Sequence, residues 1–181
     1  MTLDKHLEEF YKNNNIPING GVNDKTFKFP VFGLNLTLPN PKFRREAIHI
    51  HDLQHVLNNC DTSWKGESFI AGWEISTGMW KYFPLGILSL WALGYSIWLY
   101  PKDAFLGYKK GSNCNGIIDL KKTRQEFLEM ELNQLINLTT KNKEFRFGIK
   151  QSIGFVFWVL ISQLILLAPI LILLFSILLF V

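Results

Sequence analysis

The spacing of apolar and polar residues predicts a chain that is mainly helical. Apolar side chains recur every three or four residues, as on one buried helix face, in stretches at about 3–12, 41–58, 67–80 and 116–140. The second stretch begins at Asn40-Pro41, where asparagine is a favoured helix cap and proline suits the first helical position. No segment predicts a convincing ladder of strands, so the expected fold class is all-α.

Residues 13–40 are punctuated by prolines and glycines and predict an irregular connection. Apolar residues partly alternate between Phe27 and Leu38, which leaves a short extended piece as the alternative. We therefore expect an irregular N-terminal arm at 1–40, followed by a helical domain at 41–150.

The last 27 residues, 155–181, contain no charged residue and no histidine. A helix of this length reaches roughly 40 Å, which exceeds the thickness of a hydrocarbon core of about 30 Å. Pro169 predicts a kink, which helices in membranes tolerate. A buried core helix is the alternative, although such helices rarely stay apolar on every face for so long. We expect a C-terminal transmembrane helix.

Charges next to this segment predict its orientation. One acid, Glu144, stands among four basic residues that precede the segment: Lys141, Lys143, Arg146 and Lys150. Positive charge beside a membrane helix favours the cytoplasmic side, and the first ten residues lack the apolar run of a signal peptide. The sequence thus predicts a single-pass anchor with its soluble domain on the cytoplasmic side, where Cys60 and Cys114 remain reduced.

Residues 82–100 form a second uncharged stretch, of 19 residues. A crossing here would export residues 101–150, which carry ten of the nineteen lysines and arginines, against the positive-inside tendency. The aromatic rings, prolines and glycines of the stretch indicate instead a membrane-facing segment, a helix or a pair in or against the bilayer. A true second crossing is the alternative.

The chain has a net charge of +4, and its basic residues are interleaved with acids or clustered beside the apolar C-terminal segment. Nucleic-acid binding calls for a basic stripe, so no nucleic-acid partner is expected. Basic residues beside an anchor suit the anionic headgroups of a membrane.

Three of the four histidines fall within seven residues, at positions 49, 51 and 55. On a helix His51 and His55 share a face, with Asp52 at its border and His49 turned away. Two imidazoles and a carboxylate suit zinc, and also iron or manganese. Glu67 opens the next helix and could fold back as a further ligand. Glu74, seven residues later, could be another ligand, a partner of a ligand or a proton carrier.

Simpler interpretations stand beside these. Histidines four residues apart also occur by chance on solvated helix faces. Cys60 could approach a metal as a thiolate, although a lone cysteine in a turn is more often only a small residue. Arg44 and Arg45 could meet a substrate carboxylate, although a solvated helix start is the commoner reason for them. Glutamate does not directly follow the first histidine, so peptide hydrolysis is not indicated.

The residues His51, Asp52, His55 and Glu67 stand in the arrangement HDxxH-x11-E. This arrangement resembles the signature of the coenzyme Q biosynthesis protein family, the metal-binding protein of the ubiquinone synthesis complex. The resemblance extends over about 39–138 and includes further residues of the following helix: Gly66, Trp73, Glu74, Thr77 and Gly78. The irregular N-terminal arm and the apolar segment 155–181 have no recognised counterpart in that family.

The resemblance implies an all-α fold and a divalent ion of the zinc type (Zn²⁺), held by His51, Asp52, His55 and Glu67. It further implies a prenylated aromatic lipid as partner and a decarboxylase that acts at ring carbon 1 of a polyprenyl hydroxybenzoate. Glu74 is then the candidate catalytic proton carrier. The alternative is a non-catalytic prenyl-lipid-binding scaffold that organises other quinone-biosynthesis enzymes.

Overall fold

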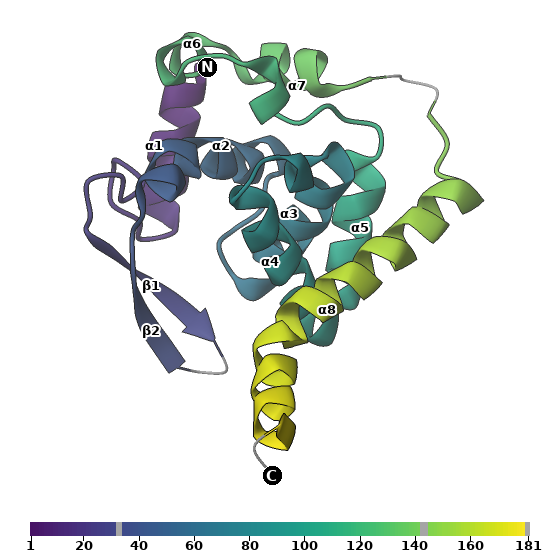
Figure 1. Cartoon of the computed structure of the whole chain (residues 1–181). Helices are drawn as coiled ribbons and strands as arrows, with labels where there is room; N and C mark the ends of the chain where they lie inside the picture. Colours follow the sequence, from purple (N-terminus) through teal and green to yellow (C-terminus); the bar gives the residue numbers. More distant parts are fainter. Residues whose placement is uncertain (32–33, 142–144, 180–181) are drawn as a thin grey trace. The chain divides into compact units, whose positions relative to one another are not determined.

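The computed structural model describes residues 1–31, 34–141 and 145–179 (Figure 1). Within these residues the chain has eight α-helices and a single two-stranded sheet, which confirms the predicted mainly helical fold. Lys143 and Glu144 of the basic stretch, and the last two residues of the expected anchor, lie outside the described residues. The chain divides into two compact units, which are described separately: Met1–Asp61 with Ile117–Leu138, and Thr62–Gly116 with Thr139–Val181.

The first unit is built around a core that its N-terminal helix completes. Its elements are α1 (Leu3–Asn13), β1 (Thr26–Val31), β2 (Leu34–Pro39), α2 (Lys42–Asn58), the 3-10 helix η2 (Ile118–Leu120), α6 (Arg124–Glu129) and α7 (Leu132–Thr139). Helix α1 packs against both α2 and α6. Leu3 of α1, Leu53 of α2 and Phe127 of α6 are all buried almost completely. This core fixes the segment of α2 that carries the histidines.

The arm between α1 and α2 contains a β-hairpin. Strands β1 and β2 pair antiparallel, from Thr26 opposite Pro39 to Val31 opposite Leu34. The expectation of an irregular arm is therefore wrong for these residues, and the extended alternative is what the structure contains. Leu34, Leu36 and Leu38 alternate with polar residues, which is the period of a strand.

Helix α2 starts within one residue of the predicted position but is capped differently. Pro41 is the cap and makes no capping hydrogen bond through its side chain. The buried side chain of Asn40 instead donates to the carbonyls of Gly21 and Asp24, both at 3.0 Å. Asn40 thus fastens the arm to the start of α2 rather than capping the helix.

The single helix expected at 116–140 is wrong, because the chain breaks there into η2, α6 and α7. Lys121 adopts a left-handed conformation (φ 52°) that ends the first piece. Thr123 and Glu126 form a capping box that starts α6. Met130 is extended and ends α6, and its carbonyl accepts a hydrogen bond from the backbone N–H of Leu3 at 2.7 Å. The break therefore ties this segment to α1.

The named elements of the second unit are all helices. Its elements are α3 (Trp64–Thr77), the 3-10 helix η1 (Met79–Lys81), α4 (Leu85–Leu99), α5 (Pro101–Gly111) and α8 (Ile149–Leu179). Helix α5 was not predicted from the sequence. It packs tightly on α3 because glycines face the neighbouring backbone: Gly72 lies against Ala104, and Gly107 against Phe69.

Helix α8 contains most of the predicted anchor. Among the described residues it is the one helix long and apolar enough to cross a membrane, judged by length and composition. Figure 1 shows that α8 changes direction along its length, and Pro169 inside the helix supplies the physical cause. Helix α4 has 15 residues, so it extends about 22 Å, less than the hydrocarbon thickness of about 30 Å.

Candidate metal centre

Two histidines lie on one face of α2, a helical turn apart. The Nε2 atoms of His51 and His55 are 3.2 Å apart, and the two rings meet edge to face with 4.9 Å between centroids. Two nitrogens bound to one tetrahedral zinc at about 2.0–2.1 Å would stand roughly 3.3 Å apart. The histidine pair therefore has a separation that suits a shared divalent ion.

The ring of His55 is held in place by packing inside the first unit. It is 1% exposed and stacks on the ring of Phe10 in α1, with 5.4 Å between centroids. His51 is only partly buried and lies nearer to solvent. Packing thus holds the ring of His55, whereas His51 is only partly buried.

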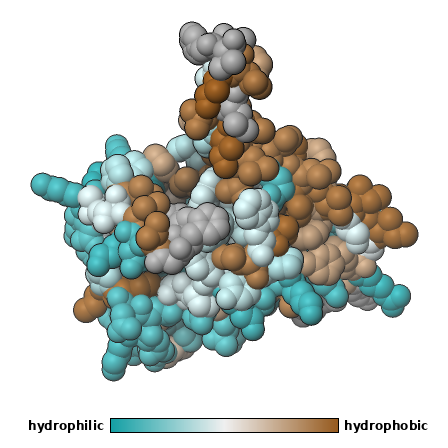
Figure 2. Space-filling model, turned by 90° about the horizontal axis from the view of Figure 1, so that it is seen from below, coloured by the Kyte–Doolittle hydropathy of each residue, from teal (hydrophilic) through white to brown (hydrophobic). Residues whose placement is uncertain are grey.

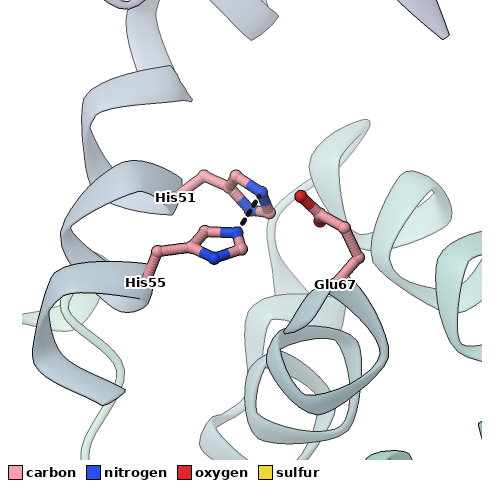
Figure 3. Close-up of side chains that lie close together, drawn as sticks. All are labelled: His51, His55 and Glu67. Atoms are coloured by element: carbon pink, nitrogen blue, oxygen red, sulfur yellow. Dashed lines mark hydrogen bonds between the residues drawn. The ribbon is translucent and has the colours of Figure 1, made fainter. Parts of the chain in front are cut away.

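Glu67 completes the candidate metal centre. It is the fourth residue of α3, whose first turn is capped by the side chain of Ser63. Figure 3 shows its carboxylate pointing toward the two imidazole rings, and one ligand atom from each of the three residues lies within 4.8 Å of the others. Two imidazole nitrogens and a carboxylate oxygen are donors that divalent transition metals prefer. This group could hold a metal ion.

Asp52 lies outside this group of three and is held by another side chain. It is buried, and its Oδ2 accepts a hydrogen bond of 2.8 Å from the hydroxyl of Tyr11. Burial, and then the charge of Asp52, raise the pKa of Tyr11, so the phenol keeps the proton that it donates. The role of Asp52 as a metal ligand stays a prediction.

Gly20 lies against the buried Tyr11–Asp52 pair, where a side chain would not fit. Its backbone is left-handed (φ 68°), and a Cβ built there would be 2.9 Å from both Asp52 Oδ2 and the Tyr11 hydroxyl oxygen. A residue with a side chain would therefore disturb the Tyr11–Asp52 hydrogen bond.

His49 does not join the metal centre, as its position on the helix predicts. Its ring lies against Phe127, with 6.5 Å between centroids. Burial, and then the positive charge of Arg124, lower the pKa of His49 and favour its neutral form. His49 is a packing residue of the first unit.

Glu74 lies further along α3, inside the second unit. It is buried, and its Oε2 accepts a hydrogen bond of 2.6 Å from the hydroxyl of Ser89 in α4. The structure does not include Glu74 in the group with His51, His55 and Glu67.

Two of the three other candidate residues, Cys60 and Arg44, make different contacts. The thiol of Cys60 donates to the carbonyl of Asn58 at 3.6 Å and is not among the grouped ligands. The guanidinium of Arg44 lies 3.8 Å from the centre of the Phe27 ring and donates to the side chain of Asn40. Arg44 thus braces the hairpin in the described structure.

Tyr11 and Ser89 are functional candidates that sequence reasoning missed. Tyr11 is 41 residues from Asp52, and Ser89 is 15 residues from Glu74. Both belong to segments whose own pattern indicates only an amphipathic or apolar helix. No local signal in the sequence marks either residue.

Comparisons of the chain with protein-family models, with curated proteins and with solved structures found no match.

Proposed function

We propose that this protein is a metal-dependent decarboxylase that acts at ring carbon 1 of a polyprenyl hydroxybenzoate-type lipid in quinone biosynthesis, at a membrane surface. The observation that carries the proposal is the grouping of His51, His55 and Glu67. These are three of the four residues in the HDxxH-x11-E arrangement that resembles the coenzyme Q biosynthesis protein family.

Zn²⁺ is the ion that we propose for this site. The donors are two imidazoles and a carboxylate, which is a common ligand set of zinc enzymes. Asp52 is the fourth proposed ligand, with Tyr11 as the residue that orients it. When bound, the ion supplies a Lewis acid that stabilises the negative charge developing on the substrate as carbon dioxide leaves.

A residue of the chain then donates a proton to the ring. In the proposed reaction the bond between ring carbon 1 and the carboxylate carbon breaks, its electron pair stays on the ring, and a proton takes the place of the carbon dioxide. No oxidant is needed. Glu74 is the proposed source of the proton, and its hydrogen bond with Ser89 holds the carboxyl group in position.

The apolar helices of the second unit support the choice of a lipid substrate. Helix α8 is long and apolar enough to cross a membrane, and α4 is a shorter apolar helix beside it. A prenyl tail partitions into a bilayer, so an enzyme that acts on its ring needs to stay at the membrane surface.

The first experiment measures metal in detergent-purified protein. We expect about one equivalent per chain in the parent, and loss of that metal in the His51→Ala/His55→Ala double variant with unchanged helical content by circular dichroism. His6→Ala is the matched control, because His6 lies in α1 outside the group. Parent protein that takes up no zinc under chelator-free conditions would remove the basis of the proposal.

The second experiment tests the reaction and the two ways in which it can fail. Zinc-loaded protein is given a prenylated hydroxybenzoate in vesicles, and carbon dioxide release is followed. Glu67→Gln is expected to lose metal and turnover together, whereas Glu74→Gln keeps the metal and loses turnover by about 10²-fold or more. Substrate binding without any product would contradict the decarboxylase and favour the alternative, a non-catalytic lipid-binding scaffold.

A further inference from the structure

Helices α4 and α8 meet through a close, polar contact inside the second unit. Gly94 of α4 makes it possible, because a Cβ there would lie 2.8 Å from the carbonyl oxygen of Ser162 in α8. The amide of Gln163 donates to the carbonyl of Gly94 at 2.9 Å, and its oxygen accepts from the indole N–H of Trp98 at 2.8 Å. One side chain of α8 thus bonds to α4 twice.

The other polar side chains of α8 beyond residue 155 are also satisfied within the protein. Ser162 donates to the carbonyl of Val159 at 2.7 Å, and Ser176 donates to the carbonyl of Ile172 at 2.8 Å. In a hydrocarbon medium each polar group must find its partner inside the protein, and small residues with interhelical hydrogen bonds join helices there. This contact has the features of helix packing in a membrane.

The outer surfaces of the two helices are uncharged and apolar. No charged residue occurs in 82–100 or in 153–179. Figure 2 shows brown, apolar side chains over a broad continuous surface as well as on the protruding segment. Six large side chains on these two helices are exposed by 47% or more: Ile87, Leu88 and Trp98 on α4, and Val156, Leu160 and Leu164 on α8. Soluble monomers rarely expose an apolar patch of more than a few hundred Å².

The two ends of α4 carry the residues that favour lipid headgroups. Trp80 and Lys81 precede the helix, Tyr100 and Lys102 follow it, and all four side chains are exposed. Aromatic rings and cations at both ends, with an apolar stretch too short to cross, are typical of a helix that lies in the boundary between headgroups and acyl chains.

We propose that α4 enters the membrane together with α8, so that a two-helix element closed by Gln163, Gly94 and Trp98 embeds the second unit, with α4 confined to the boundary of one leaflet. The partner of this element is an anionic phospholipid bilayer. Its acyl chains match the apolar surface, and its headgroups match the lysines at both ends of α4. The inference does not depend on the proposed function, because none of these residues belongs to the metal centre.

Labelling with an environment-sensitive fluorophore tests this element in the full chain. Single cysteines are introduced by Leu88→Cys on α4, Leu164→Cys on α8 and Gln125→Cys on α6, in a Cys60→Ser/Cys114→Ala background. The protein is reconstituted into vesicles of phosphatidylcholine and phosphatidylglycerol. Quenching is then compared between iodide in the water and nitroxide lipids labelled at shallow or deep acyl positions.

We expect the label on α4 to be shielded from iodide and quenched by the shallow nitroxide, the label on α8 to be quenched by nitroxide lipid, and the label on α6 to respond to iodide alone. An α4 label that is open to iodide while the α8 label is quenched by lipid would show a single-helix tether and overturn the proposal. An α4 label shielded from both quenchers, together with cross-linked dimers, would show that a second copy covers this face and would overturn it too.

A second variant tests the contact itself. Gln163→Leu removes both interhelical hydrogen bonds, and each such bond shifts a packing equilibrium in a membrane by roughly threefold. We expect iodide to reach the α4 label more readily in this variant. Ser176→Ala is the control, since its hydroxyl donates to the carbonyl of Ile172 within α8. Equal iodide access in Gln163→Leu and the parent would show that the contact does not hold α4 in place.

Discussion

At the scale of single residues, the Tyr11–Asp52 hydrogen bond joins α1 to the histidine-bearing segment of α2. Both groups are buried and 2.8 Å apart. A hydrogen bond to a charged group contributes about 2 kcal/mol, so we expect Tyr11→Phe to lower the free energy of unfolding by that amount. Chemical denaturation in detergent, followed by far-ultraviolet circular dichroism, measures the change.

Tyr100→Phe is the control for this substitution, because Tyr100 is 40% exposed and its hydroxyl can bond to water. It should unfold at the same denaturant concentration as the parent. If both variants behave alike, the hydroxyl of Tyr11 contributes no stability and does not orient Asp52.

These residues also show which parts of the site can be predicted from sequence. His51, His55 and Glu67 lie close along the chain, so helix geometry and a short turn are enough to anticipate their grouping. Tyr11 and Ser89 reach their partners only through the packing of separate helices. A pattern within one segment carries no information about such contacts.

At the scale of elements, the capping box at Thr123 decides where α6 begins. The Thr123 hydroxyl accepts from the N–H of Glu126, and the Glu126 carboxylate accepts from the N–H of Thr123. Loss of such a cap costs about 1 kcal/mol, which we expect for Thr123→Ala in thermal unfolding. Thr2→Ala is the matched control, because Thr2 stands at the start of α1 without a capping hydrogen bond. Equal losses would mean that this cap does not stabilise α6.

The glycines between α3 and α5 give a second prediction at this scale. A Cβ on Gly107 would collide with the backbone carbonyl of Phe69, and a backbone atom cannot move aside as a side chain can. Overpacking of this kind costs about 3 kcal/mol, so Gly107→Ala should lower the midpoint of thermal unfolding strongly. Gly148→Ala should not, because its Cβ would meet only Gln151 at 3.5 Å. A stable Gly107→Ala protein would contradict the close packing of α3 on α5.

The same elements explain the limits of prediction from the sequence. The apolar patterns of α1, α2 and α3 predict these helices to within three residues, and α8 begins six residues before the expected anchor. The segment 116–140 has a helical pattern too, but its breaks depend on the left-handed Lys121 and on the bond from Leu3 to Met130. The break at Met130 is held by a tertiary contact, which overrides local pattern, whereas the capping box at Thr123 is a local signal.

At the scale of the whole molecule, metal binding should raise the stability of the folded protein. An ion that binds only the folded state at 100 times its dissociation constant adds about 2.7 kcal/mol. For a chain of this size that corresponds to a rise of roughly 5–10 °C in the unfolding midpoint. We expect zinc to produce this shift in detergent and a chelator to reverse it.

The His6→Ala variant should respond like the parent, and the His51→Ala/His55→Ala variant should not respond. An equal shift in the double variant would show that zinc binds elsewhere, because the remaining carboxylates of Asp52 and Glu67 would have lost both nitrogen ligands.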